Sequence, residues 1–144
     1  MEKRLKNKYP SVNKITQTEH IEIVKEIFST ITKRYDFLNH FLSMRRDIAW
    51  RRFAVKKMRF FQNLNYLDVA CGTADLAIMA AESYPDITVT GIDFIQEMLD
   101  VGKIKINKSK LSERIRLIRA DALSLPFDDN TFDVAGIAFG IRNI

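Results

Sequence analysis

Gly72, Asp93 and Asp121 each follow a short apolar segment that predicts a buried strand. Segments with helical periodicity separate the three positions, so the sequence predicts strands that alternate with helices. Strands connected in this way form a parallel sheet with right-handed crossovers, and ligands bind at the carboxyl ends of such strands. We therefore expect these three residues to meet at one ligand site.

The residue types at these positions favour one kind of ligand. Gly72 allows a sharp turn, and the helix after it directs free N–H groups and its positive dipole end toward a carboxylate. Asp93 comes 21 residues later, a spacing at which an acid that ends the second strand accepts hydrogen bonds from both ribose hydroxyls. Asp121 can accept a bond from the adenine amino group, and the Ala122 N–H can donate to a ring nitrogen. Together they favour an adenosine ligand that carries a carboxylate.

Each signal is weak alone, since a glycine after a strand is usually a turn and an aspartate there is usually a surface cap. All three residues closely follow a predicted strand, and this shared position makes a common ligand site a stronger prediction than any one residue does alone. A dinucleotide-binding enzyme is the main competitor, because its phosphate turn lies in the same kind of fold. That turn needs the pattern G-x-G-x-x-G, and residues 70–75 (ACGTAD) contain a single glycine.

The elements that must position these residues follow from the pattern of apolar residues. We predict strands over residues 66–70, 87–92, 115–118 and 132–138, and helices over 75–83 and 96–106. The segment before the first strand is predicted to be helical, with helices over 18–32, 37–42 and 48–61. The inward face of the third helix is expected to hold Trp50, Phe53, Ala54 and Met58, although Trp50 among arginines also suits a lipid surface. Residues 1–15 are expected to form a mobile basic arm.

Composition limits the class of protein. The chain has 144 residues, 47% of them hydrophobic and 28% charged, which is typical of a globular protein. A single cysteine excludes an internal disulfide, and no apolar run is long enough to span a bilayer. The first 62 residues hold 15 Lys and Arg against 6 Asp and Glu, and the remainder hold 8 against 12. Charge of this kind does not identify a partner, because nucleic acid, anionic lipid and solvent all suit a basic surface.

Several motifs resemble those of known methyltransferases. Residues 68–76 (DVACGTADL), 91–93 (GID) and 121–127 (DALSLPF) resemble the pattern of class I S-adenosylmethionine-dependent enzymes. More specific are residues 28–39, with Arg34, Tyr35, Asp36 and Asn39, then 50–52 (WRR) and 139–143 (FGIRN). These resemble the ubiquinone/menaquinone C-methyltransferase family from about residue 25 onward. The resemblance implies a Rossmann-like α/β fold with S-adenosyl-L-methionine as cofactor.

The resemblance also implies roles for individual residues. The cofactor would be contacted by Gly72, Thr73, Asp93, Asp121, Ala122 and Ala138. The substrate would be a reduced prenylated quinone, methylated on a ring carbon beside a hydroxyl. Positioning and electrostatic roles would fall to Arg142 and Asn143. Tyr35, Asp36 and Asn39 would close over the substrate, or would only begin a helix with an inward aromatic residue.

The same resemblance sets expectations for organisation. Residues 1–62 would form the basic arm and a helical substrate or lid region, and residues 63–144 the cofactor half of the catalytic domain. The family sheet has seven strands in the order 3-2-1-4-5-7-6, of which this chain would supply four, and the exposed fourth strand would favour a homo-oligomer. Ala74 stands where the family ordinarily has Gly, and we expect its methyl group to weaken cofactor binding.

Two other hypotheses remain open. The basic segment suits an RNA methyltransferase, although no aromatic platform or nucleic-acid motif accompanies it, so no nucleic acid partner is expected. An S-adenosylmethionine-binding fragment without activity is also compatible with Ala74 and with the missing strands. We expect a cytoplasmic protein without a bound metal, with peripheral contact at the inner face of the membrane as an open alternative.

Overall fold

A parallel four-stranded sheet forms the centre of the part of the chain that the structure describes. The computed structural model describes residues 22–23, 26–27 and 46–138. The strands are β1 (Asn65–Val69), β2 (Thr88–Asp93), β3 (Ile115–Arg119) and β4 (Val134–Ile137). Their order across the sheet is β3-β2-β1-β4, which confirms the predicted order and the Rossmann-like α/β class.

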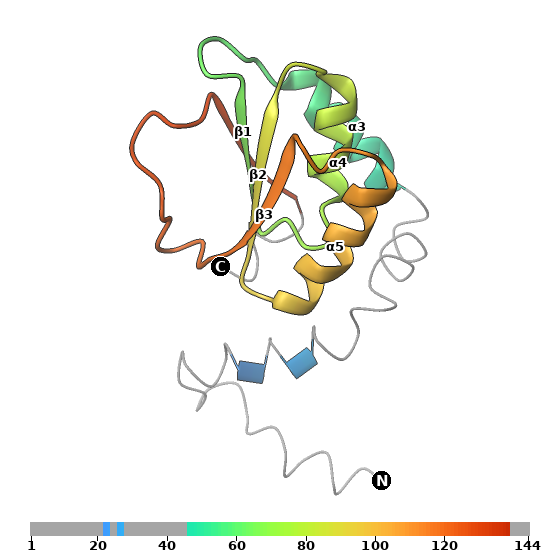
Figure 1. Ribbon diagram of the computed structural model, residues 1–144, viewed down its shortest axis with the longest axis vertical. Coiled ribbons are helices and arrows are strands. Elements are labelled where there is room, and N and C mark those ends of the chain that lie inside the picture. The colour runs from blue at the N-terminus through green and yellow to red at the C-terminus, as the bar shows by residue number, and fades with distance from the viewer. Residues whose placement is uncertain (1–21, 24–25, 28–45, 139–144) are drawn as a thin grey trace, which may run out of the picture.

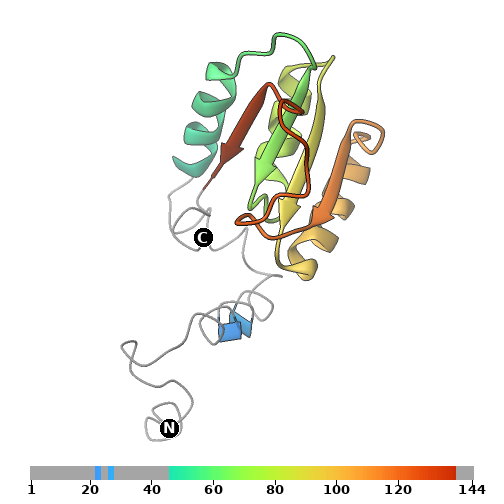
Figure 2. The ribbon, with the colours of Figure 1, turned by 90° about the vertical axis from the view of Figure 1, so that its left-hand side faces the viewer.

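Three helices cover one face of this sheet (Figure 1). They are α3 (Arg46–Lys57), α4 (Asp75–Ser83) and α5 (Gln96–Lys108). The opposite face is crossed by the connection from β3 to β4, residues 120–133 (Figure 2). The predicted bounds of α4 are confirmed at both ends, and α5 continues two residues beyond its predicted end.

The core lies between α4 and the central strands. Three alanines on α4 are fully buried and allow the helix backbone to approach the sheet closely. They pack with aromatic and aliphatic side chains from the strands, including Tyr66 on β1 and Val89 on β2. The Tyr84 hydroxyl at the end of α4 donates to the Val55 carbonyl at 2.9 Å, which joins the ends of α3 and α4.

The predicted inward face of α3 is wrong. Trp50 and Phe53 are 55% and 65% exposed, and Ala54 is also exposed, whereas Met58, just beyond the helix, is buried as predicted. The buried residues of the helix are Asp47, Arg51 and Val55. We expected apolar residues at the buried positions of this helix. Instead, Arg51 and Asp47 form an ion pair at 2.7 Å, which allows two charged side chains to be buried together. The two charges neutralise each other, and α3 can turn its other face outward.

Strand β4 lies at one edge of the sheet. It pairs with β1, with Val69 opposite Ile137, and within the described residues no strand lies on its other side. The strand is shorter than predicted at both ends, and Phe132 lies in the preceding connection, where it packs edge-on against Phe127 with ring centroids 5.0 Å apart. Association through this edge stays a prediction.

Two predicted helices fall largely or wholly outside the described residues. Of residues 18–32, the structure describes Glu22, Ile23, Glu26 and Ile27, all helical, and residues 37–42 lie outside. Among the helices that are described, none has the length and apolar character needed to cross a bilayer.

Asp133 connects the start of β4 to the segment that precedes β1. Its carboxylate accepts hydrogen bonds from the backbone N–H groups of Phe61, Gln62, Asn63 and Leu64, at 2.8 to 3.4 Å. Partial burial of this carboxyl acts to raise its pKa, but the four N–H donors outweigh that effect and lower the pKa below its usual value. The charged form of Asp133 therefore holds this segment in place.

This interaction predicts a specific dependence of stability on pH. A lowered folded-state pKa means that the stabilisation is complete above the ordinary aspartate pKa, about 4, and is lost as pH falls through the folded value. Asp133→Asn should lower Tm by a few degrees at pH 7, and the gap from the wild type should close below about pH 4. Thermal unfolding followed by circular dichroism measures both. Asp129→Asn, in the same connection, is the control, and a gap that persists unchanged at pH 3 would contradict the assignment.

Candidate functional site

The turn between β1 and α4 has an unusual backbone. Ala70, Gly72 and Ala74 all have positive φ angles, of 51°, 56° and 67°. Such left-handed conformations cost an alanine roughly 1–2 kcal/mol, and strain of this kind is typical of functional sites. The turn is held by hydrogen bonds from Cys71 N–H to the Ile92 carbonyl and from Ala74 N–H to the Cys71 carbonyl, both 2.9 Å.

Gly72 and Asp93 are in direct contact, as their places at neighbouring strand ends predicted. The Gly72 N–H donates to Asp93 Oδ2 at 2.8 Å, and the Ile95 N–H donates to Oδ1 at 2.9 Å. Burial raises the pKa of Asp93, and the N–H groups of Ile95, Gly72 and Phe94 counteract part of this shift. The result is a half-buried carboxylate fixed beside the turn.

The end of β3 lies beside Asp93. The Ala120 N–H donates to the Asp93 carbonyl at 3.1 Å. Asp121 and Ala122 therefore follow at the same carboxyl end of the sheet as Asp93. The Asp121 side chain is exposed, and its Oδ1 accepts from the Leu123 N–H at 2.9 Å. The structure thus brings three strand ends together, with polar groups on each.

Thr73 is placed differently from its neighbours. Its side chain is buried, and Lys105 Nζ donates to its hydroxyl oxygen at 2.9 Å from α5. The hydroxyl is therefore already engaged within the protein. Lys105 lies 32 residues away in sequence, so no local pattern indicated the contact.

Asp68 on β1 is a residue that the sequence argument passed over. It is almost fully buried, and the Tyr66 hydroxyl donates to its Oδ1 at 3.4 Å. Burial raises the pKa of Asp68 to about 7, while the Ala77 N–H, Tyr66 and the charge of Arg51 act in the opposite direction. Among the described residues, Oδ2 of Asp68 has no hydrogen-bond partner, so this buried acid is only partly satisfied by Tyr66. In the sequence, Asp68 could have been noticed as a single acidic residue within an apolar run.

The methyl group of Ala74 packs against α5, and its effect on cofactor binding stays a prediction. Ala74 is fully buried, and its Cβ faces α5, 3.3 Å from the position that a Cβ on Gly102 would take. The cost of this alanine therefore lies in its backbone angle and in its packing against α5.

Of the remaining candidates, Ala138 lies at the carboxyl end of β4, beside the end of β1, because Ile137 pairs with Val69. Ala138 follows β4 and lines a groove of about 390 Å³ between α3 and β4, together with Trp50 and Arg51. Tyr35, Asp36, Asn39, Arg142 and Asn143 lie outside the described residues. Within residues 46–138 and the two short helical pieces, no three potential metal ligands gather. Cys71 is a free, half-buried thiol, as predicted, and burial raises its pKa.

Comparison with known proteins identifies the family. The model of the ubiE/COQ5 methyltransferase family matches residues 14–144. The chain belongs to this family. Its motifs at 68–76 and 139–143 therefore come from a methyltransferase family, as the resemblance implied.

Two relatives illustrate the match. The ubiquinone/menaquinone biosynthesis C-methyltransferase UbiE of Geotalea uraniireducens is 47% identical over 128 residues, which cover 88% of this chain and 54% of the relative. The demethylmenaquinone methyltransferase of Listeria welshimeri is 42% identical over 131 residues, which cover 90% and 55%. The chain thus spans about half the length of the curated relatives it matches.

Solved structures confirm the fold. A geranyl diphosphate C-methyltransferase from Streptomyces coelicolor A3(2) aligns with a TM-score of 0.60 at 18% identity, covering 65% of this chain and 35% of that one. The S-adenosylmethionine-dependent methyltransferase SibL aligns with a TM-score of 0.58 at 24% identity, covering 67% and 28%. The described sheet and helices therefore have the class I methyltransferase architecture.

The contact between Ala74 and Gly102 gives a test of how closely α5 packs on the turn. A Cβ at Gly102 would lie 2.8 Å from Leu117 Cδ1 and 3.3 Å from Ala74 Cβ, so Gly102→Ala should destabilise the protein by about 1–3 kcal/mol. Adding Ala74→Gly should recover part of this loss, because glycine removes one clash and takes a positive φ without strain. Urea unfolding measures both, with Lys103→Ala on the exposed face of α5 as control. A double variant no more stable than Gly102→Ala would show that the two residues do not interact.

Proposed function

We propose that this chain carries the cofactor half of an S-adenosylmethionine-dependent C-methyltransferase that acts on a reduced prenylated quinone in menaquinone or ubiquinone biosynthesis. The observation that carries the proposal is the direct contact between the Gly72 N–H and the Asp93 carboxylate at two neighbouring strand ends. Membership of the ubiE/COQ5 family and the names of the relatives support the reaction class.

Each strand end offers groups that could bind a different part of S-adenosylmethionine. The first turn of α4, which Ala74 leaves without a side-chain cap, suits the carboxylate of the amino acid. Asp93 is placed to accept from the ribose hydroxyls, and Asp121 with the Ala122 N–H is placed for the adenine. Thr73 would contribute through its main chain, since its side chain is buried and its hydroxyl oxygen accepts from Lys105. Ala138 would contribute main chain and shape.

The cofactor supplies a methyl group on a sulfonium, and the protein must align a nucleophile with it. A ring carbon of the quinol becomes nucleophilic when the adjacent hydroxyl loses its proton. We assign stabilisation of the developing phenolate to Arg142 and orientation of the proton acceptor to Asn143. Tyr35, Asp36 and Asn39 are proposed to close over the substrate.

Among the other hypotheses, nothing in the comparisons favours an RNA substrate. The helical lid boundary near residue 62, the oligomer through β4 and the cytoplasmic location stay predictions. Peripheral contact with a membrane is supported by the exposed rings of Trp50 and Phe53 on α3, with Lys57 Nζ 5.3 Å from the Phe53 ring centroid. Exposed aromatic rings on a helix that also carries a cation beside one of them suit the interface of a bilayer.

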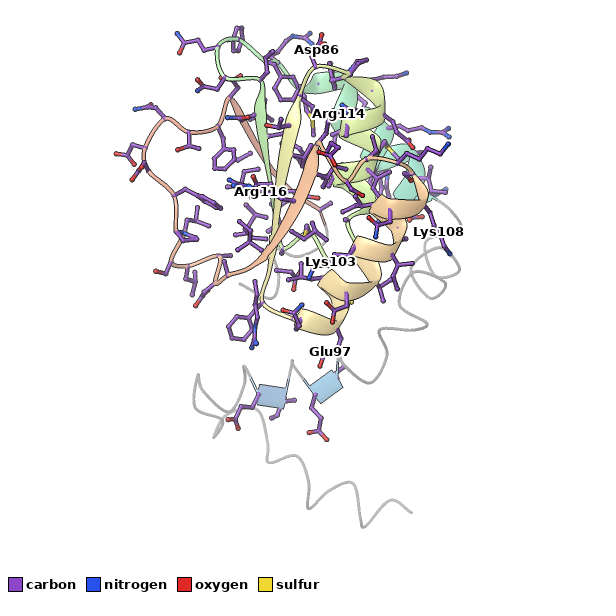
Figure 3. All side chains as sticks on the ribbon, in the orientation of Figure 1. Asp86, Glu97, Lys103, Lys108, Arg114 and Arg116 are labelled. Atoms are coloured by element: carbon purple, nitrogen blue, oxygen red, sulfur yellow. The ribbon has the colours of Figure 1, made fainter. Side chains whose placement is uncertain are left out.

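Cofactor binding can be tested without the substrate. We expect residues 1–144 to bind S-adenosylhomocysteine, and Asp93→Ala should cost about 1–3 kcal/mol by removing the ribose acceptors. Isothermal titration calorimetry measures the change. Asp86→Ala is the control, because Asp86 precedes β2 and lies at the opposite end of the sheet (Figure 3). Equal affinities of wild type and Asp93→Ala would reject the site.

The reaction itself requires a longer protein. A chimaera of residues 1–144 followed by the C-terminal remainder of the Geotalea uraniireducens relative should transfer a labelled methyl group to dithionite-reduced demethylmenaquinone. The oxidised quinone should not react, because it has no hydroxyl to deprotonate. Residues 1–144 alone should bind the cofactor without turnover. Equal labelling of oxidised and reduced quinone would contradict the mechanism.

A further inference from the structure

Charged side chains connect all three helices beneath the β1–α4 turn. Arg51 on α3 pairs with Asp47 at 2.7 Å, and its Nη1 lies 3.8 Å from Oδ2 of Asp75, the first residue of α4. Lys105 on α5 contacts the other oxygen of Asp75, with Nζ 2.5 Å from Oδ1. The same Nζ donates to the Thr73 hydroxyl. Each oxygen of Asp75 therefore faces a separate cation.

The packing of α5 explains how Lys105 reaches this position. Gly102, three residues earlier, lies so close to the turn that a Cβ there would sit 3.3 Å from the Thr73 carbonyl carbon. Residues three apart share one face of a helix, so Lys105 lies on the face of α5 that Gly102 brings against the turn. Helix α5 thus contacts the turn in two ways, by close packing at Gly102 and through the charged side chain of Lys105.

Shielding from water makes these ion pairs stronger than ordinary surface pairs. The Arg51 and Asp47 side chains are 10% and 2% exposed, and those of Lys105 and Asp75 are 29% and 24%. Exposed pairs contribute little to stability, whereas breaking a shielded pair leaves a charge without compensation. Loss of Lys105 would remove the nearer cation from Asp75, and loss of Arg51 would remove the farther one together with the ion pair to Asp47.

The location of Asp75 makes that charge important for binding. Asp75 begins α4, and the first turn of a helix attracts anions through its free N–H groups and its dipole. A carboxylate that is free to move at this position would repel a second carboxylate and compete with it for the N–H groups. Lys105 neutralises Asp75, and Arg51 at 3.8 Å helps to fix it in place, which removes both effects.

We propose that Arg51 and Lys105 are positioning residues for the cofactor, which hold and neutralise Asp75 so that the first turn of α4 accepts the carboxylate of the bound amino acid. This inference rests on the proposed function, because it assumes that S-adenosylmethionine binds at the strand ends. It also gives α3, which precedes the sheet in sequence, a part in cofactor binding.

Two ligands separate this role from a general structural one. S-adenosylhomocysteine carries the amino-acid carboxylate, and methylthioadenosine has the same nucleoside and sulfur without it. Lys105→Met should weaken binding of S-adenosylhomocysteine about five- to thirtyfold and change that of methylthioadenosine less than about twofold. Arg51→Met should act in the same direction. Calorimetry on the full chain, well below each variant's Tm, measures these affinities.

Matched controls and a rescue complete the test. Lys103→Met removes the same charge from an outward position on α5 (Figure 3), where Lys103 faces Asp100 at 3.6 Å, and should leave both affinities unchanged. Arg52→Met is the corresponding exposed control on α3. Adding Asp75→Asn to Lys105→Met should restore S-adenosylhomocysteine affinity, because no unneutralised carboxylate remains. A loss of packing alone would not be repaired by that change.

The outcomes distinguish this inference from the proposed function. If the wild type binds neither ligand, the proposed function fails. If the wild type binds S-adenosylhomocysteine and Lys105→Met binds it equally well, or weakens both ligands alike, the positioning role is overturned. Should Arg51→Met fail to fold, Lys105→Met decides the question, because its partly exposed side chain can be replaced without leaving a cavity.

Discussion

The turn from β1 into α4 is the constraint on which the rest of this structure depends. Within five residues the chain takes three left-handed conformations, at Ala70, Gly72 and Ala74, and delivers a helix directly above the strand that precedes it. Hydrogen bonds to β2 and the close approach of α5 at Gly102 hold this path. The same geometry that strains the turn places Gly72 beside Asp93. The fold and the candidate site are therefore consequences of one local backbone arrangement.

Local pattern predicted most of the fold. Apolar runs located all four strands to within two residues. The helical spacing of apolar residues that begins after the turn placed α4 at its observed bounds. The prediction failed for α3, because the sequence argument assumed that inward positions are apolar. Asp47 and Arg51 are four residues apart and neutralise one another, so their burial depends on a pair rather than on either residue. Patterns of single-residue hydropathy do not contain that information.

The candidate site was predictable to the extent that strand ends determine it. Gly72, Asp93 and Asp121 were located from their places after apolar runs, and in the structure they lie at the carboxyl ends of three neighbouring strands. The engagement of Thr73 by Lys105 could not be predicted, since it depends on how α5 packs on the turn 32 residues earlier. Asp68 was missed for a related reason. An acid within a strand looks like an exception until its surroundings, with the Tyr66 hydroxyl and the charge of Arg51, are in place.

The carboxylate of Asp133 accepts hydrogen bonds from backbone groups up to 72 residues before it, and β4 pairs with β1 residues that lie nearly as far back in the sequence, as Val134 does with Tyr66. Such long sequence separation slows folding, because a large loop must close before the contacts form. During synthesis, β1 leaves the ribosome well before its partner exists, while the local α4–β2–α5–β3 segment can already assemble. One side of the central strand would then stay open in the nascent chain until residues 133–137 emerge. The order of translation thus makes β4 the last of the four described strands to join the sheet, and β1 is exposed to wrong partners in the interval before it joins.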